Sequence, residues 1–182
     1  MTAGVELLEE SGDPNIGLRE IARRAGVSHG APRRWFPTHR SLLAAIADVG
    51  LRDLAGELAA TAERSDHAVT EVARTYVDFA VRRPAMFTLM FRHDLLEGAG
   101  AELRNVSRPL FRWLVTLIEN GAGVDDADAS AATLWVGVHG IAVLASTGSL
   151  GLAIPGVDTD ELVGQVVDRA LSPADAGPRT RR

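Results

Sequence analysis

The fold is decided by the stretch Gly17-Leu-Arg-Glu-Ile-Ala-Arg-Arg-Ala-Gly-Val-Ser-His-Gly-Ala-Pro-Arg-Arg-Trp-Phe36. Its pattern predicts two short helices, residues 18–25 and 29–35, joined by a tight turn. The apolar residues of the first helix recur at the spacing of one buried helical face: Leu18, Ile21, Ala22 and Ala25. Two helices joined in this way form the unit that many proteins insert into a groove of DNA.

The Gly-Val-Ser sequence between the two helices has the residue types that such a turn requires. Gly26 can adopt a positive φ without strain, and Val27 is expected to plug the junction. Ser28 is a favoured N-cap because its hydroxyl oxygen can accept a hydrogen bond from a free backbone N–H of the second helix. The turn therefore supports a helix on each side.

The charge of this region differs in sign from that of the whole chain. Residues 17–40 contain six arginines and one glutamate, a net charge of +5, whereas the 182-residue chain has −5. The remainder therefore carries about −10 and would repel a polyanion everywhere except at this one surface. All 19 basic residues are arginine, and none is lysine.

Helical periodicity and stop signals continue along the rest of the chain, without strand alternation or a hairpin signal. We therefore predict an all-α fold of about nine helices, with an N-terminal three-helix unit followed by a larger helical bundle. Thr38 and Asp66 are the expected caps of the two helices that follow the three-helix unit. The expected helices outside the quoted stretch span residues 2–11, 38–64, 66–83, 85–91, 103–120, 127–149 and 159–171.

The long uncharged segment from Ala129 to Val157 exceeds the length of about 20 residues that a membrane helix needs. Its glycines, hydroxyl residues and Pro155 argue against a membrane span, and acidic residues flank it where basic or aromatic anchors would be expected. A helix buried between other helices, within or between subunits, fits this composition better.

Composition excludes several classes of function. The chain has no cysteine, so disulfides, thiolate chemistry and cysteine-bound zinc are ruled out. The five histidines form no HxH or HxxxH pair, and no nucleophile elbow, phosphate-binding loop or carboxylate pair occurs in an apolar setting. We expect no metal site, no cofactor and no catalytic residues. Because no export signal precedes the first helix, we expect a cytoplasmic protein that does not associate with membranes.

Two motifs resemble those of a known family. Ile21-Ala-Arg-Arg-Ala-Gly-Val-Ser28 and Phe36-Pro-Thr-His-Arg-Ser-Leu-Leu43 look like the DNA-binding domain of TetR family transcriptional regulators. Trp135-Val-Gly-Val-His-Gly140 resembles the signature of the WHG type of C-terminal domain in that family, and Arg83-Pro-Ala-Met-Phe-Thr-Leu-Met-Phe91 also suits it.

The resemblance implies a domain organisation and a function. Residues 1–46 would form the helix-turn-helix DNA-binding domain, and residues 48–171 the ligand-sensing and dimerisation domain. The composition of residues 172–182, with two prolines and three arginines, predicts a disordered tail. The protein would be a homodimeric one-component repressor that binds palindromic operator DNA and is released by a small apolar or aromatic ligand. Activation instead of repression stays open.

The residues expected to contact DNA surround the turn and the second helix. They are Arg19, Arg24, Ser28, His29, Gly30, Ala31, Arg33, Arg34, Trp35 and His39. Arginine binds phosphate or the O6 and N7 atoms of guanine. The alternatives are a solvated helix face for the arginines and a core position for Trp35.

The chain departs from the family pattern at the proposed DNA contacts. Pro32-Arg33 stands where the family usually has Leu-Tyr, and His39 stands where it usually has lysine. Arg33 can replace the tyrosine hydroxyl as a charged donor, and proline is tolerated in the first turn of a helix. His39 carries a full charge only at lower pH. The chain also begins inside the first expected helix, without the basic extension of most relatives.

A second group of residues is expected to bind the ligand. Flexible methionine side chains, aromatic rings and one histidine can enclose an apolar pocket in which the histidine forms a polar contact with the ligand. The same residue types at helical spacing are also typical of core packing. Trp135 and His139 share a helix face because they are four residues apart. The group consists of Met86, Phe87, Met90, Phe91, Trp113, Leu117, Trp135 and His139.

The resemblance implies a dimer interface formed by the last two long helices. Gly137, Gly140, Leu144 and Gly148 fall near one side of the first of them, and the glycines permit close helix approach. The seam would be completed by residues of the final helix: Leu162, Val163, Val166 and Val167. Close packing within one subunit is the alternative for the glycines.

A different class of function is also compatible with the sequence. Pro32, His39 and the absent basic extension suggest a helical small-molecule-binding or interaction protein whose DNA-binding unit has weakened.

Overall fold

A computed structural model describes residues 1–13, 16–28, 30–92, 96, 98 and 103–172. In this part of the chain the secondary structure is entirely helical, so the predicted all-α fold is confirmed. The elements are α1 (Thr2–Ser11), α2 (Leu18–Arg24), the 3₁₀ turn η1 (Pro32–Arg34), α3 (His39–Ala62), α4 (Ala68–Arg82), α5 (Pro84–Met90), α7 (Arg104–Gly121), α8 (Ala127–Ser146), α9 (Ser149–Ala153) and α10 (Thr159–Leu171).

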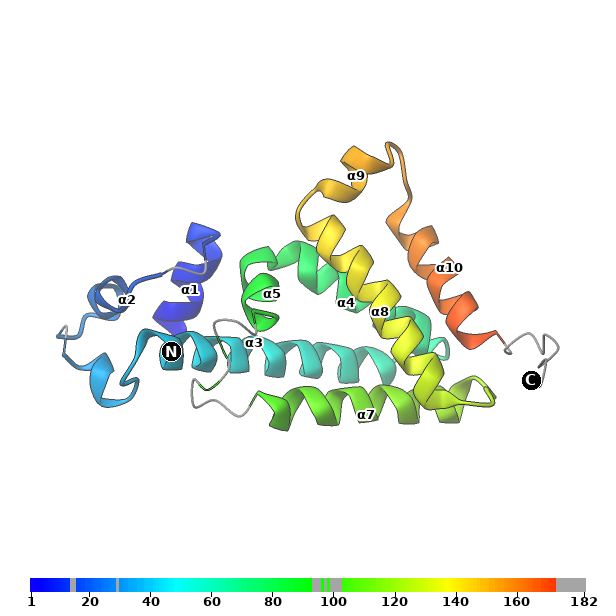
Figure 1. The fold of residues 1–182 in the computed structure, drawn as a ribbon, viewed down its shortest axis with the longest axis horizontal. Helices are drawn as coiled ribbons and strands as arrows, with labels where there is room; N and C mark the ends of the chain where they lie inside the picture. Colours follow the sequence, from blue (N-terminus) through cyan, green and yellow to red (C-terminus); the bar gives the residue numbers. More distant parts are fainter. Residues whose placement is uncertain (14–15, 29, 93–95, 97, 99–102, 173–182) are drawn as a thin grey trace, which may run out of the picture.

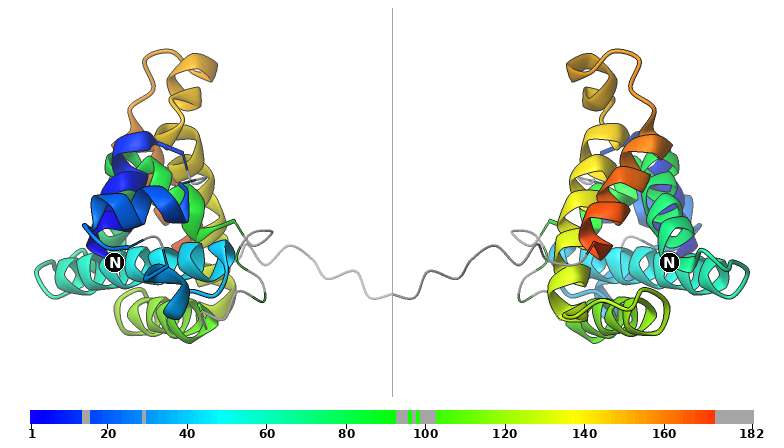
Figure 2. Two further views of the ribbon diagram at one scale, coloured as in Figure 1. Left: turned by 90° about the vertical axis from the view of Figure 1, so that its left-hand side faces the viewer. Right: turned by 90° about the vertical axis from the view of Figure 1, so that its right-hand side faces the viewer.

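The helix α3 organises the molecule. Figure 1 shows it running from the N-terminal unit of α1, α2 and η1 along the whole base of the bundle, with α7 beside it. The helices α4 and α8 pack above these two, and α10 covers the outer side of α8. The end views show α9 at the apex, away from the body of the bundle (Figure 2). One helix therefore belongs to both parts of the molecule.

The start of α3 follows the predicted capping. The Thr38 side chain accepts from the Ser41 backbone N–H at 3.0 Å, and the Ser41 hydroxyl accepts from the Thr38 N–H at 3.1 Å, which forms a capping box. The predicted Asp66 cap is wrong, because α4 begins after His67 and has no side-chain cap. Asp66 lies one residue too early to reach the first free N–H groups.

The turn after α2 forms as predicted in its backbone but not in its side chains. Gly26 has φ +66°, and the Val27 N–H donates to the Ala22 carbonyl at 3.0 Å. The Val27 side chain is 46% exposed, so the expectation that it plugs the junction is wrong. Ala25 is also exposed, whereas Ile21 is buried as predicted.

The second helix of this unit, expected over residues 29–35, is not formed in the residues that are described. Only η1 is present, and its bonds from the Ala31 N–H to the Ser28 carbonyl and from the Arg34 N–H to the Ala31 carbonyl span three residues. Pro32 has no N–H to donate, which removes one bond that an α-helix could use. The Ser28 carbonyl, rather than its hydroxyl, accepts the first bond.

The segment expected as one helix over residues 127–149 is divided. Asp126 caps α8 by accepting from the Ala129 N–H at 2.9 Å, and α8 ends at Ser146. Gly148 then adopts φ +70°, which interrupts the helix before α9 begins. By length and composition alone, α8 is the one helix in the described residues that could cross a membrane. In the fold it packs against α4, α7 and α10.

The glycines of α8 were expected to serve either a dimer interface or close packing within one subunit. The packing of α8 on α10 decides between these for one of them. A Cβ added to Gly137 would lie 2.6 Å from a Val166 methyl carbon, so Gly137 permits close packing within the subunit. Gly140 has no such neighbour within 4 Å. Val163 and Val167 are buried in their own subunit, and the expectation that they form the dimer seam is wrong.

The helix α5 contacts both α1 of the N-terminal unit and α3. Arg83, at the start of α5, donates to Glu9 of α1 at 2.6 Å and to Asp53 of α3 at 2.8 Å. In α3, a Cβ added to Gly50 would overlap the Met86 sulfur and lie 2.9 Å from the Met90 sulfur. The helix α5 is therefore fastened to α1 and α3 by charge on one side and by tight packing on the other.

Candidate functional site

The predicted DNA contacts form an exposed surface beside the turn after α2. Trp35 is 79% exposed, which excludes the core position considered for it. Ser28, Gly30, Arg33 and Arg34 are also exposed, and Ala31 is half-buried. His29 lies outside the described residues.

The arginines of this surface fall into two groups. Arg23 pairs with Glu20 at 3.0 Å, and Arg24 donates to Glu10 at 2.6 Å. By contrast, Arg19, Arg33 and Arg34 have exposed side chains that form no ion pair or hydrogen bond with the rest of the described chain; we call these three residues the unpaired arginines. Their charge is available to an external anion.

Two of the predicted DNA contacts are engaged inside the protein. Arg24 bridges α2 to α1, because it also lies 3.5 Å from Glu6, and its hydrogen bond lowers the pKa of Glu10. His39 places Nε2 2.6 Å from the Ile16 carbonyl, so this nitrogen donates and holds the start of α3 against the segment between α1 and α2. Arg24 and His39 therefore hold the helices of the N-terminal unit together and do not add to the exposed side chains that could bind DNA.

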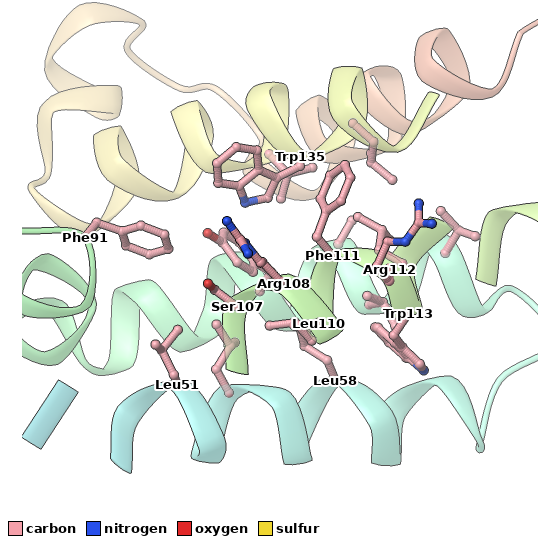
Figure 3. Close-up of a pocket in the computed structure, with 18 residues that line it drawn as sticks. Leu51, Leu58, Phe91, Ser107, Arg108, Leu110, Phe111, Arg112, Trp113 and Trp135 are labelled. Atoms are coloured by element: carbon pink, nitrogen blue, oxygen red, sulfur yellow. The ribbon is translucent and has the colours of Figure 1, made fainter. Parts of the chain in front are cut away.

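The bundle contains a cavity of about 550 Å³ between α3, α4, α7 and α8. Its volume lies in the range of small-molecule sites. Aliphatic side chains form the floor, and aromatic side chains stand at its sides (Figure 3). The lining consists of Leu51, Leu54, Leu58, Val69, Val72, Ala73, Tyr76, Phe91, Ser107, Arg108, Leu110, Phe111, Arg112, Trp113, Leu114, Leu134, Trp135 and Val138.

The eight residues predicted to bind a ligand have different positions relative to this cavity. Phe91, Trp113 and Trp135 line it. The other five do not. Met86 and Met90 are buried against Gly50 of α3, and Phe87 is buried with its ring against those of Tyr76 and His139. Leu117 and His139 are half-buried and do not line the cavity. For the buried residues Met86, Phe87 and Met90, the alternative of core packing therefore holds.

His139 holds the aromatic wall together. Its Nδ1 lies 2.9 Å from the Tyr76 hydroxyl, and its ring centroid is 4.4 Å from that of Phe91 and 5.7 Å from that of Trp135. Burial lowers the pKa of His139 and raises that of Tyr76, so both are neutral at pH 7. The pair links α8 to α4 without bringing charge to the wall.

The bundle that contains this cavity matches a family model. The model is described as the tetracyclin repressor-like C-terminal domain, and it matches residues 69–170, more than half of the chain. This chain belongs to the TetR family of transcriptional regulators.

Solved structures share the fold of this TetR family regulator over nearly its whole length. A protein of unknown function from Rhodococcus sp. RHA1 is 27% identical with a TM-score of 0.79, and the match covers 93% of this chain and 90% of that chain. The TetR family regulator PfmR from Thermus thermophilus is 13% identical with a TM-score of 0.66, over 93% and 94%. A TetR transcriptional regulator from Rhodococcus sp. RHA1 is 21% identical with a TM-score of 0.60, over 93% and 92%. No curated protein matches the chain.

The sequence prediction missed several residues that line the cavity of this TetR family regulator. Tyr76 is the only tyrosine of the chain, and a lone polar aromatic on the apolar face of α4 was a signal that could have been used. Arg108, Phe111 and Arg112 are spaced three and four residues apart on α7, as one helical face requires. Their contribution was hidden because arginines on an amphipathic helix usually face water.

Proposed function

We propose that this regulator is a homodimeric repressor that acts in the cytoplasm and binds a palindromic operator. We further propose that an apolar or aromatic ligand releases it from DNA. Residues 1–46 would bind DNA, residues 48–171 would bind the ligand and the partner subunit, and residues 172–182 would contribute to neither. Two DNA-binding units would meet successive major grooves about 34–36 Å apart.

The observation that carries this proposal is the course of α3. Its capped start adjoins the surface with the unpaired arginines, and Leu51, Leu54 and Leu58 from its second half line the cavity. A ligand that reshapes the cavity can therefore tilt the element that supports the DNA-binding unit. Such a ligand acts only if it binds the DNA-competent arrangement less tightly than the other.

The contacts of Arg83 support a second connection between the two parts. Arg83 is 18% exposed at its side chain and binds Glu9 and Asp53, which belong to α1 and α3. Because α5 ends beside the cavity residue Phe91, movement of that aromatic ring would reach α1 through Arg83. We propose that this ion pair transmits ligand binding to the DNA-binding unit.

Exposed apolar side chains on α8 and the following residues support a dimer interface there. Val136 is 65% exposed, Leu144 43% and Leu152 84%, and Gly140 leaves room beside them for a partner helix.

A charge at Leu144 is expected to convert the dimer into monomers in sedimentation experiments. The control is Val81→Glu, since Val81 is 49% exposed on α4. Dimers that survive Leu144→Glu would argue against this interface.

The experiment that tests the regulatory function is a salt titration of binding to the DNA that flanks its own gene. An unrelated duplex of equal length serves as the control. A repressor binds the flanking DNA specifically, with a salt slope of about 0.9 for each phosphate contact. Equal, weak binding to both duplexes would contradict the proposal.

Two observations favour a second function, a helical ligand-binding protein whose DNA-binding unit has weakened. Where the second helix was expected, over residues 29–35, the described residues form only the short turn η1. His39 is hydrogen-bonded to the Ile16 carbonyl, so this nitrogen is not available to bind phosphate. Under this alternative the cavity still binds its ligand, and the titration shows no preference between the duplexes.

A further inference from the structure

The polar groups of the cavity are concentrated on one short segment of α7. Ser107 and Arg108 bring a hydroxyl and a guanidinium to a lining that is otherwise apolar apart from Tyr76 and Arg112. The Tyr76 hydroxyl is already bonded to His139. Figure 3 shows the Arg108 guanidinium directed across the cavity toward Trp135, with Ser107 beside it. The unused donors of the site therefore lie together.

The two arginines of the lining differ in their partners. Arg112 lies 3.2 Å from Asp128, and in Figure 3 its guanidinium points away from Arg108. Arg108 forms no ion pair or hydrogen bond within the described part of the chain. Its charge is thus uncompensated at the cavity, whereas that of Arg112 is balanced.

The sign of the charge restricts the ligand. The described lining contains two arginines and no carboxylate, so it offers nothing to balance a cation. An aromatic wall can attract a cation, but Arg108 in the same site opposes this. A neutral oxygen could accept a hydrogen bond from Arg108, but it would leave the positive charge of the guanidinium unbalanced. An anionic group both accepts these hydrogen bonds and balances the charge.

We propose that the ligand is an amphiphilic anion with a carboxylate head, and that Arg108 recognises this head with the help of the Ser107 hydroxyl. This inference rests on the proposed role of the cavity as the ligand site and assigns the chemical class of the ligand. The head lies at the exposed Arg108, where water lowers the cost of bringing in a charge. The apolar tail extends toward Leu54, Leu58 and Val72.

Arginine suits this role for geometric reasons. Its planar fork matches the two oxygens of a carboxylate, which permits paired hydrogen bonds that a neutral alcohol cannot make. The apolar walls near the head reduce competition from water on one side of the pair. Selectivity for the charged head is therefore the measurable signature of Arg108.

Three probes with the same tail test the proposal: decanoate, decanol and decylamine. Trp113 and Trp135 line the cavity, so tryptophan fluorescence of the full chain reports binding. We expect decanoate to bind at least about tenfold more tightly than decanol, because a charged hydrogen bond is worth that much or more. Decylamine is expected to bind more weakly than decanol.

Two variants separate the head from the tail. Arg108→Gln is expected to weaken decanoate binding about tenfold and to leave decanol binding unchanged. Arg104→Gln is the matched control on the same helix, and it should change neither affinity more than about twofold because the exposed Arg104 does not line the cavity. Circular dichroism of both variants checks that the helical fold is retained.

Each outcome has a distinct meaning. Equal binding of decanoate and decanol to the natural protein, or a decanoate affinity unchanged by Arg108→Gln, would overturn the carboxylate assignment while the cavity stays a ligand site. Binding of none of the three probes would overturn the cavity as the site of an aliphatic ligand, and the proposal with it. Equal losses in Arg108→Gln and Arg104→Gln would show a general charge effect and would likewise reject the role of Arg108.

Discussion

Arginine has different neighbours at the surface of the N-terminal unit and at the cavity of the bundle. The unpaired arginines are exposed to water, as is Trp35, and can reach an external polyanion. Arg108 is also exposed, but it borders the apolar and aromatic side chains of the cavity, which restrict what else a molecule bound there can contain. In water, guanidinium attracts phosphate over a distance that salt controls, whereas beside a cavity it selects one head group of one ligand.

The two regions also differ in how completely side chains fill their interiors. In the N-terminal unit, Leu8, Ile21 and Ile46 are buried, and most of the described residues predicted to contact DNA are exposed. The bundle buries more side chains but leaves about 550 Å³ unfilled in its cavity. The first region therefore depends on charge and the second on space, and the following substitutions test this division.

The largest effect is expected from removing two of the unpaired arginines together. Arg33→Ala with Arg34→Ala should weaken operator binding at least about tenfold for each lost contact and reduce the salt slope by about 0.9 for each phosphate. Fluorescence anisotropy over a series of salt concentrations measures both quantities. Arg23→Ala is the control, because that residue is paired with Glu20. A slope that stays the same would sink these assignments.

A smaller effect, on folding stability, is expected where the two regions join. Gly50→Ala should lower the free energy of unfolding by about 1–3 kcal/mol, because its methyl group would overlap the Met86 sulfur in a filled core. Gly56→Ala, in the same helix with nothing within 4 Å, should raise it by about 0.5–1 kcal/mol. Urea unfolding measures both variants. Equal changes would show that the α3 to α5 contact is loose.

Filling the cavity should have the reverse effect on stability. Ala73→Leu places a larger side chain into the empty space from α4 and should raise the free energy of unfolding by about 0.5–2 kcal/mol. The same variant should bind decanoate more weakly than the natural protein while its affinity for the operator is retained. A loss of stability would indicate that the wall at Ala73 cannot accommodate added volume.

The smallest effect concerns pH. Because burial lowers the pKa of His139 below its ordinary 6.5, the unfolded chain takes up this proton first as the pH falls. The contribution of neutral His139 to the free energy of unfolding is fully present above pH 6.5. It is lost progressively as the pH falls from 6.5 to the lowered pKa of His139 in the folded protein. We expect the pH dependence of urea unfolding between about pH 7 and 5 to be shallower in His139→Gln. An identical dependence would mean that His139 does not titrate differently on folding.

Much of the fold could be predicted from local patterns, and the failures have local physical causes. The Thr38 cap and the Gly26 turn were recognisable because each depends on neighbouring residues only. The second helix of the N-terminal unit failed because Pro32 and Gly30 weaken helical bonding over a span too short to compensate. Gly148 was expected inside a helix, but its freedom at positive φ ends α8 instead.

The cavity was harder to predict, since it depends on which residues of four helices face one another. Phe91, Trp113 and Trp135 were found from their residue types, but Met86 and Met90, of the same apolar character, pack against Gly50. Arg108 was missed because a single sequence does not show which exposed arginine borders a hollow. Pairing could not be predicted either: Arg24 and Arg33 look alike in sequence, yet only Arg24 meets a carboxylate of another helix.

The unpaired arginines also limit how this protein can be switched off. Guanidinium keeps its proton at every physiological pH, and a chain without lysine offers no side-chain amine for acetylation. Neither acidity nor that common modification can erase the positive surface. Under the proposed function, a ligand would release the protein from DNA by displacing these arginines as a group and not by removing their charge.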